Sequence, residues 1–155
     1  MRPEIFVKRS RIDAPAEEVF AWHEQPGALE RLTPPWEQVQ VVQESGSLKN
    51  GARVTLLTRL GPFRMKWVAE HRDYVKGRQF RDVQVSGPFA RWDHTHRFEP
   101  DGDAACWLED RIEYVLPGWW LGKLFGASIA RKRLERLFEY RHRVTAEQLA
   151  VKRER

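Results

Sequence analysis

The chain has 155 residues, 41% of them hydrophobic, and carries a formal net charge of +5. This length predicts a single domain, residues 1–155, whose core needs no disulfides. The lone Cys106 excludes an intramolecular disulfide and fits a reducing compartment. No run approaches the roughly 20 apolar residues of a membrane span, and residues 1–4 lack the apolar core of a signal peptide, so we expect a cytoplasmic protein with no transmembrane segment.

The N-terminal third predicts one strand followed by two short helices. Residues 5–12 are rich in β-formers and predict the first strand. Asp13 can cap a helix whose first turn holds Pro15, and residues 27–32 predict a second short helix that Pro34 and Pro35 end.

Six further strands follow at regular spacing. They are predicted at residues 36–42, 53–60, 63–75, 79–86, 90–100 and 105–116, and most of the turns between them contain glycine. Strands joined by such short turns pair with their sequence neighbours, which predicts an antiparallel meander.

A long helix is predicted after Pro117-Gly118, where the apolar spacing changes to 3.6 residues and continues to about Arg143. Its predicted apolar stripe is Leu121, Leu124, Phe125, Ile129, Leu134, Leu137 and Phe138. Residues 145–148 resemble a capping box, which predicts a separate terminal short helix or tail at 145–155. Trp119-Trp120 is expected to pack against the sheet edge, with gating of a cavity or contact with a membrane interface as alternatives.

Much of the positive charge falls after residue 130, on the outer face of this helix. Such runs usually form a solvated face, so we expect no specific nucleic-acid partner. An interaction module that uses this face on an acidic partner or RNA is the weaker alternative. The sequence indicates no oligomeric state.

The order of elements predicts an α+β helix-grip fold. In it, a curved antiparallel sheet of about seven strands surrounds a long C-terminal helix, with two short helices between strands one and two. Resemblance to a known family rests on Pro34-Pro35-Trp36-Glu37, Gly61-Pro62-Phe63, Trp67-Val68-Ala69-Glu70-His71, Phe80-Arg81-Asp82-Val83-Gln84, Gly87-Pro88-Phe89, Trp92-Asp93-His94-Thr95-His96-Arg97-Phe98, Asp110-Arg111-Ile112-Glu113-Tyr114 and Phe138-Glu139-Tyr140-Arg141-His142.

With these segments the chain resembles the SRPBCC ligand-binding proteins of the START and polyketide-cyclase-like superfamily. The resemblance covers nearly the whole chain and implies an internal cavity between the sheet and the long helix. Relatives in this branch are sometimes joined to domains that resemble sugar-nucleotide epimerases. The superfamily contains lipid carriers, cyclases, hydrolytic enzymes and plain binders, so the resemblance leaves open whether this protein is an enzyme.

Polar residues interrupt the predicted inner face of the sheet. The turn lengths place His71 opposite Asp82, Asp82 opposite His94, and His94 opposite Asp110, which gives one row across four strands. The last register also sets Asp93 against Arg111 and Arg91 against Glu113 on the outer face. Because neighbouring strands lie about 4.8 Å apart, each imidazole in the row can meet a carboxylate.

We predict that this face binds a small hydrophobic or aromatic molecule. The predicted ligand-binding residues are Trp67, His71, Phe80, Asp82, Gln84, Trp92, His94, His96, Phe98, Asp110 and Tyr114. The alternative is a cyclase-, dehydratase- or hydrolase-like enzyme in which His94 moves a proton and Asp82 or Asp110 orients it. A third interpretation is a hydrogen-bonded network that only stabilises the sheet.

The pair His94 and His96 has a spacing that also suits zinc, since both imidazoles share one strand face. The obvious third ligands, Asp82 and His71, are expected to be engaged as hydrogen-bond partners instead. We therefore predict no metal ligands and no cofactor. His23 is expected on the inner face of the first helix, and His23 and His142 are candidates for capping and surface contacts.

Overall fold

The computed structural model describes residues 2–60, 62–118 and 123–155. Its elements, in chain order, are β1 (Glu4–Ile12), α1 (Ala16–Glu24), α2 (Ala28–Arg31), β2 (Val39–Glu44), β3 (Arg53–Leu60), β4 (Phe63–Val75), β5 (Gln79–Ser86), β6 (Arg91–Asp101), β7 (Ala105–Val115) and α3 (Lys123–Arg153). Three of the predicted strands, at residues 53–60, 63–75 and 79–86, have the predicted bounds.

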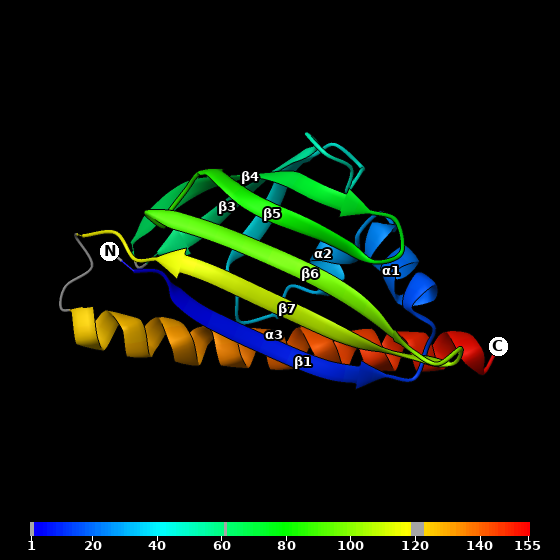
Figure 1. The fold of residues 1–155 in the computed structure, drawn as a ribbon. Helices are drawn as coiled ribbons and strands as arrows, with labels where there is room; N and C mark the ends of the chain where they lie inside the picture. Colours follow the sequence, from blue (N-terminus) through cyan, green and yellow to red (C-terminus); the bar gives the residue numbers. More distant parts are fainter. Residues whose placement is uncertain (1, 61, 119–122) are drawn as a thin grey trace.

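The strands form one seven-stranded antiparallel sheet in the order β1-β7-β6-β5-β4-β3-β2. The sheet curves over α3, which runs along its length; α1 lies towards the end where α3 terminates, and α2 lies behind β5 and β6, nearer the middle of the sheet (Figure 1). This arrangement confirms the helix-grip fold. No helix in the described parts of the chain is long and apolar enough to span a membrane.

The two short helices begin differently from the prediction. Pro15 is the N-cap of α1, and no side chain caps this helix. Asp13 instead pairs with Arg11, its Oδ1 lying 2.7 Å from Nη1. Gly27 precedes α2 with φ at 79°, a left-handed backbone conformation that glycine adopts without strain.

The long helix α3 continues to Arg153, so the predicted separate terminal helix at 145–155 is wrong. Thr145 is fully buried inside α3, and its hydroxyl donates to the carbonyl oxygen of Arg141 at 2.8 Å rather than capping a new helix. Ile129 is also misassigned, since it is 60% exposed. Trp119, Trp120 and Leu121 lie outside the described residues.

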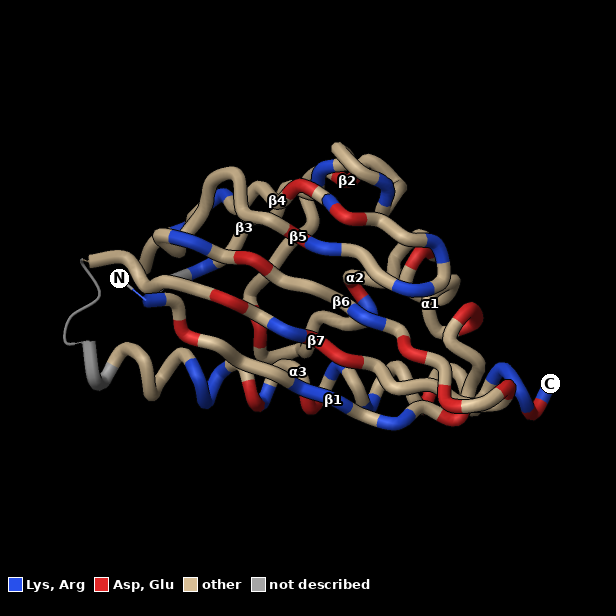
Figure 2. Tube along the Cα trace, in the orientation of Figure 1, with Lys and Arg blue, Asp and Glu red and all other residues tan. Residues whose placement is uncertain are grey.

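Many basic positions and several acidic ones lie along α3, and both signs of charge are mixed along the strands (Figure 2). Several of the arginines have their own acidic or aromatic partners. Arg131 pairs with Glu135, Arg143 pairs with Glu147, and Arg136 stacks on Trp36. These contacts support the prediction of a solvated face.

The central registers position the inner polar residues. The predicted pairs His71 with Asp82, and Asp82 with His94, are confirmed. The turn between β4 and β5 is one residue longer than predicted. The pairing of His71 with Asp82 is nevertheless kept, because a bulge in β4 near Asp73, whose φ is 51°, compensates for the extra residue.

The β6–β7 register differs from the prediction by two residues. His96, not His94, lies opposite Asp110, because the hairpin loop begins one residue later than predicted, at Gly102. A shift of two residues keeps every side chain on its predicted face, since successive side chains alternate.

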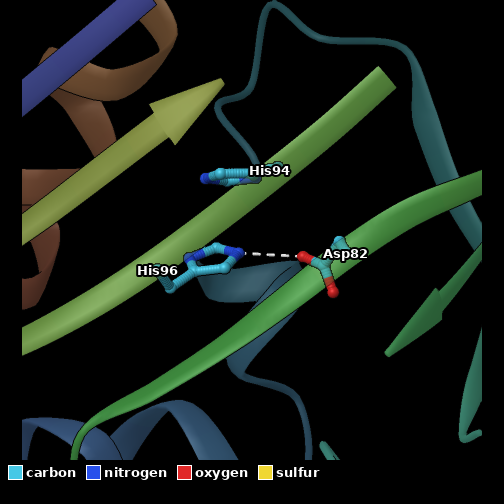
Figure 3. Close-up of side chains that lie close together, drawn as sticks. All are labelled: Asp82, His94 and His96. Atoms are coloured by element: carbon cyan, nitrogen blue, oxygen red, sulfur yellow. Dashed lines mark hydrogen bonds and ion pairs between the residues drawn. The ribbon is translucent and has the colours of Figure 1, made fainter. Parts of the chain in front are cut away.

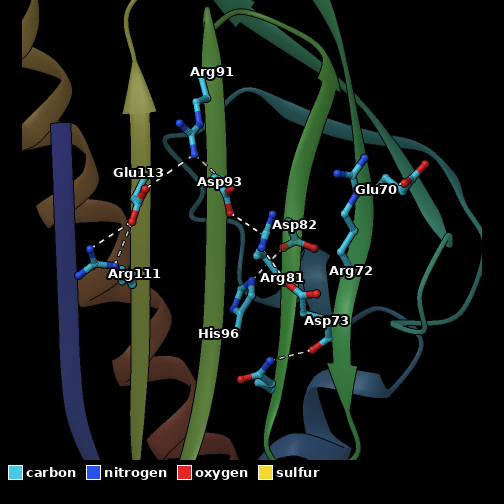
Figure 4. A network of polar contacts seen from close by, with 11 residues as sticks. Glu70, Arg72, Asp73, Arg81, Asp82, Arg91, Asp93, His96, Arg111 and Glu113 are labelled. Atoms are coloured by element: carbon cyan, nitrogen blue, oxygen red, sulfur yellow. Dashed lines mark hydrogen bonds and ion pairs between the residues drawn. The ribbon is translucent and has the colours of Figure 1, made fainter. Parts of the chain in front are cut away.

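Opposite charges on the outer face therefore meet diagonally rather than directly across the strands. Asp93 lies opposite Glu113, and Arg91 contacts both carboxylates, at 3.7 and 3.9 Å (Figure 4). Arg81 also binds Asp93, with Nε 2.9 Å from Oδ1. Long side chains reach diagonal neighbours as well as direct ones, so charge pairing did not distinguish the two registers.

The apolar core has two parts. One cluster gathers around Phe20, Phe98 and Leu108, and the other gathers around Phe6, Trp92 and Phe138. Along β6, Trp92 and Phe98 belong to different clusters, and His94 and His96 lie between them on the same inner face. The break in the apolar core is therefore the place where the polar residues converge.

Candidate functional site

His96 is the centre of the buried polar cluster. Its Nε2 lies 2.8 Å from Asp82 Oδ2, and its Nδ1 lies 2.8 Å from Asp110 Oδ1. Burial alone would lower the pKa of His96, but the charge and hydrogen bonds of Asp110 and Asp82 raise that pKa to about 9. Its Nε2 donates a hydrogen bond to Asp82, its Nδ1 faces the charge of Asp110, and His96 is therefore an imidazolium at neutral pH.

Asp110 is the shared acceptor of three imidazoles. Besides His96, His94 Nε2 lies 2.7 Å from Oδ1 and His142 Nε2 lies 2.6 Å from Oδ2. Burial would raise the pKa of Asp110, but the charge of His96 and the three hydrogen bonds hold it well below its ordinary value. His142 also hydrogen-bonds Ser10 Oγ through Nδ1, at 2.7 Å, which connects α3 to β1.

Asp82 stands between His96 and His71. Its Oδ1 lies 2.5 Å from His71 Nδ1, but the two atoms are out of line for a hydrogen bond. Burial would raise the pKa of Asp82, and the two imidazoles lower it below the ordinary range. Both carboxylates of the cluster are therefore ionised.

His94 differs from His96 in its protonation. Burial and the positive charge of His96 lower the pKa of His94 to about 4, against a weaker opposing effect of Asp110. His94 is thus neutral and donates Nε2–H to Asp110. Its Nδ1 has no hydrogen bond within the described parts of the chain.

A cavity of about 220 Å³ lies between the inner face of the sheet, α2 and α3. Most of its lining is apolar and comes from Leu29, Leu32, Val39, Val54, Leu56, Trp67, Ala69, Phe80, Phe89, Trp92, Leu134, Leu137 and Phe138. His71, Asp82, His94 and His96 form a polar part of its wall. An apolar cavity with a few convergent polar groups is the usual form of a small-molecule site.

The sequence matches the family model described as "Polyketide cyclase / dehydrase and lipid transport" over residues 12–139. The chain belongs to this family. The matched range includes the sheet from β2 to β7, the predicted polar row and most of the cavity lining. A comparison of the sequence with curated proteins gives no match.

Three solved structures illustrate how this family fold recurs. A protein of Thermus thermophilus is 18% identical, with a TM-score of 0.74, and the alignment covers 96% of this chain and 98% of that one. The Zhui aromatase/cyclase of Streptomyces sp. R1128 is 17% identical, with a TM-score of 0.66 and coverage of 99% and 96%. At these identities the likeness shows the fold alone.

The third structure is a nucleoside-diphosphate sugar epimerase of Corynebacterium glutamicum. It is 28% identical over 94% of this chain, with a TM-score of 0.68, but the match spans only 29% of the epimerase chain. The similarity therefore concerns one portion of that longer protein, in agreement with the domain arrangement that the resemblance implied.

Seven of the eleven predicted ligand-binding residues line the cavity of this family member. They are Trp67, His71, Phe80, Asp82, Trp92, His94 and His96. The other four do not line it. They are Gln84, Phe98, Asp110 and Tyr114.

Each of these four has a different position. Gln84 hydrogen-bonds both backbone polar groups of Phe89 and so supports the β5–β6 turn. Phe98 and Tyr114 are packed inside the two apolar clusters. Asp110 lies behind His94 and His96, where it orients the imidazoles of the cavity wall.

Metal ligation competes with this hydrogen bonding. Asp82, His94 and His96 place one possible ligand atom each within 4.8 Å of the others (Figure 3). Both nitrogens of His96, however, face carboxylates, and His94 Nε2 is bound to Asp110. A metal ion held by His96 would have to displace its contacts with Asp82 and Asp110, whereas His94 could offer its Nδ1, which has no hydrogen bond among the described residues.

Two important residues of α3 were missed. His142 is 3% exposed and binds Asp110, so its predicted surface role is wrong. Arg141 lines the cavity. Helical spacing could have predicted that both residues face inward, because Arg141 and His142 follow the inward-facing Phe138 by three and four residues. His23, expected on the inner face of the first helix, lines the cavity and donates Nδ1–H to the carbonyl oxygen of Val19.

Proposed function

We propose that this protein binds one small, mainly apolar or aromatic molecule in the cavity between the sheet and α3. The observation that carries the proposal is a cavity of about 220 Å³ whose apolar lining is interrupted on one wall by His71, Asp82, His94 and His96. The family fold supports ligand binding in general.

The polar wall supports orientation of a ligand rather than simple filling of space. Asp110 and Asp82 fix the rings of His94 and His96, so a polar group of the ligand would meet positioned partners. His94 Nδ1 is an atom of this wall that remains available for a new hydrogen bond. The ligand would gain affinity from apolar burial and orientation from this nitrogen.

A larger side chain in the cavity should weaken binding. We expect 2-naphthamide to bind the wild type and to bind Leu137→Trp at least about tenfold more weakly, because a larger ring would occupy the cavity. Isothermal titration calorimetry measures both affinities. The matched control is Val85→Trp, since Val85 is 48% exposed and does not line the cavity. Equal affinity in all three proteins, each shown to be folded by circular dichroism, would place the binding elsewhere.

Proton-transfer catalysis in the same cavity is the second candidate. His94 is neutral, is bonded to Asp110 through Nε2, and lines the cavity, which is the arrangement of an oriented general base. A similar fold occurs in an aromatase/cyclase. Binding ranks first because a pKa of about 4 makes His94 a weak base at neutral pH.

A test of the second candidate uses an aryl methyl ketone in D₂O. His94 Nδ1 would take a proton from the methyl carbon and solvent deuterium would replace it, which NMR detects as loss of the methyl signal. We expect His94→Gln to slow the protein-catalysed exchange by about 10²- to 10⁴-fold, the usual contribution of a general base. Exchange that is no faster than in buffer, or equal exchange by folded His94→Gln, rejects the catalytic role.

A further inference from the structure

Arg141 is a cation on the wall of the cavity. It belongs to the stripe of α3 that faces the cavity, together with Leu134, Leu137 and Phe138. Its Nε donates to the carbonyl oxygen of Leu32 at 3.2 Å, and its Cζ lies 5.1 Å from the centre of the Phe138 ring. These contacts fix the stem of the side chain where α2 meets α3 and leave the two terminal nitrogens without an acceptor among the described residues.

The other guanidinium of the cavity has a carboxylate of its own. Arg133 binds Glu37 through two hydrogen bonds, with Nε 3.1 Å from Oε1 and Nη2 2.5 Å from Oε2. Within residues 2–60, 62–118 and 123–155, by contrast, Arg141 has no carboxylate at ion-pair distance. The two arginines therefore differ in what they can offer to a ligand.

The nearby carboxylates of Asp82 and Asp110 do not contact Arg141, because other residues engage them. Asp82 contacts His71 and His96, and Asp110 contacts His94, His96 and His142. Both act on Arg141 only through charge at a distance, while burial lowers the pKa of its guanidinium. Arg141 is partly buried and has no contacting anion among the described residues, and an incoming anion would offset the cost of its partial desolvation.

We propose that the ligand is an apolar acid, whose carboxylate pairs with the terminal nitrogens of Arg141 while its rings fill the apolar part of the cavity. This inference rests on the proposed binding function and adds the chemical class of the ligand. A guanidinium matches a carboxylate with two parallel hydrogen bonds, which supplies specificity as well as affinity.

The cavity limits the size of such an acid. An apolar cavity of about 150 Å³ admits benzene, and pockets for drug-sized ligands start at about 300 Å³. The volume of about 220 Å³ falls between these values and suits one or two rings. We therefore choose 2-naphthoate as the probe and 2-naphthamide, which has the same shape without the charge, as its partner.

The experiment measures both affinities by calorimetry for the full chain, for Arg141→Gln and for Arg143→Gln. Arg143 is the matched control, because it lies on the same helix, pairs with Glu147 at 3.9 Å and does not line the cavity. We expect the wild type and Arg143→Gln to bind naphthoate at least about tenfold more tightly than naphthamide. Arg141→Gln should lose about ten- to a hundredfold in affinity for naphthoate and less than about threefold for naphthamide.

Three results would overturn the inference. Binding of naphthamide with no preference for naphthoate rejects the anion site and leaves the proposed binding function intact. Equal loss of both affinities in Arg141→Gln shows that Arg141 only supports the cavity. Failure of the wild type to bind either probe rejects the acid ligand together with the proposed function.

Discussion

Replacement of Asp110 with Asn is expected to lower the free energy of unfolding by about 3–5 kcal/mol, the usual cost of removing one partner from a buried ion pair. His94, His96 and His142 all donate towards this one carboxylate. An amide has one acceptor oxygen, and its NH₂ group would face a ring N–H. The His96 imidazolium would also lose one of its two counter-charges. Urea denaturation monitored by circular dichroism measures the change.

The control for this variant is Asp73→Asn. Asp73 binds Arg81 at 2.6 Å, but its side chain is 53% exposed, and asparagine tolerates its positive φ. Exposed pairs contribute about 0–1 kcal/mol, so Asp73→Asn should change stability little. If Asp110→Asn proves as stable as Asp73→Asn, the buried cluster does not depend on its shared carboxylate.

Stability should have a maximum near pH 6.5 and decline on both sides. The native pKa of His96 is raised from 6.5 to about 9, so its contribution is complete below pH 6.5 and is lost as the pH rises through 9. A shift of this size corresponds to about 3 kcal/mol. The native pKa of His94 and that of His23 are lowered to about 4, so the unfolded chain binds more protons between pH 4 and 6.5 and stability falls as the pH drops.

The alkaline decline can be assigned to one residue. Urea denaturation at half-unit pH steps from 6.5 to 9.5 should show a loss on the order of 3 kcal/mol in the wild type and a nearly flat profile for His96→Gln. The variant will be less stable overall, so the slope with pH is the informative quantity. An equal slope in both proteins would mean that His96 is not the group that loses its proton.

The sheet could be predicted from the sequence because turns and alternation act locally. The polar face of β6 follows from period two alone, and two of the three registers of the polar row are as predicted. The third register, between β6 and β7, differs by two residues from the prediction, because the sequence around Asp101-Gly102-Asp103 allows two equally short loops. Faces were preserved, so His94 and Asp110 still met, although as diagonal neighbours.

The contribution of α3 to the site was harder to predict. Helical spacing gives the face of Arg141 and His142 relative to Phe138, but it does not say which part of the sheet lies opposite each turn. His142 meets Asp110 and Arg141 meets Leu32 because of how the long helix crosses the sheet and α2, which is a property of tertiary packing. The cavity likewise depends on residues from most of the elements, and the majority of these residues carry no polar signal.

The most direct test of ligand binding in this cavity is an NMR structure of the protein with bound 2-naphthamide. Binding between the sheet and α3 predicts nuclear Overhauser effects between the ring protons of the probe and the methyl groups of Leu56, Leu134 and Leu137, which all line the cavity. Contacts limited to exposed methyl groups such as those of Val85 and Ile129, or no contacts at saturating probe, would contradict binding between the sheet and α3.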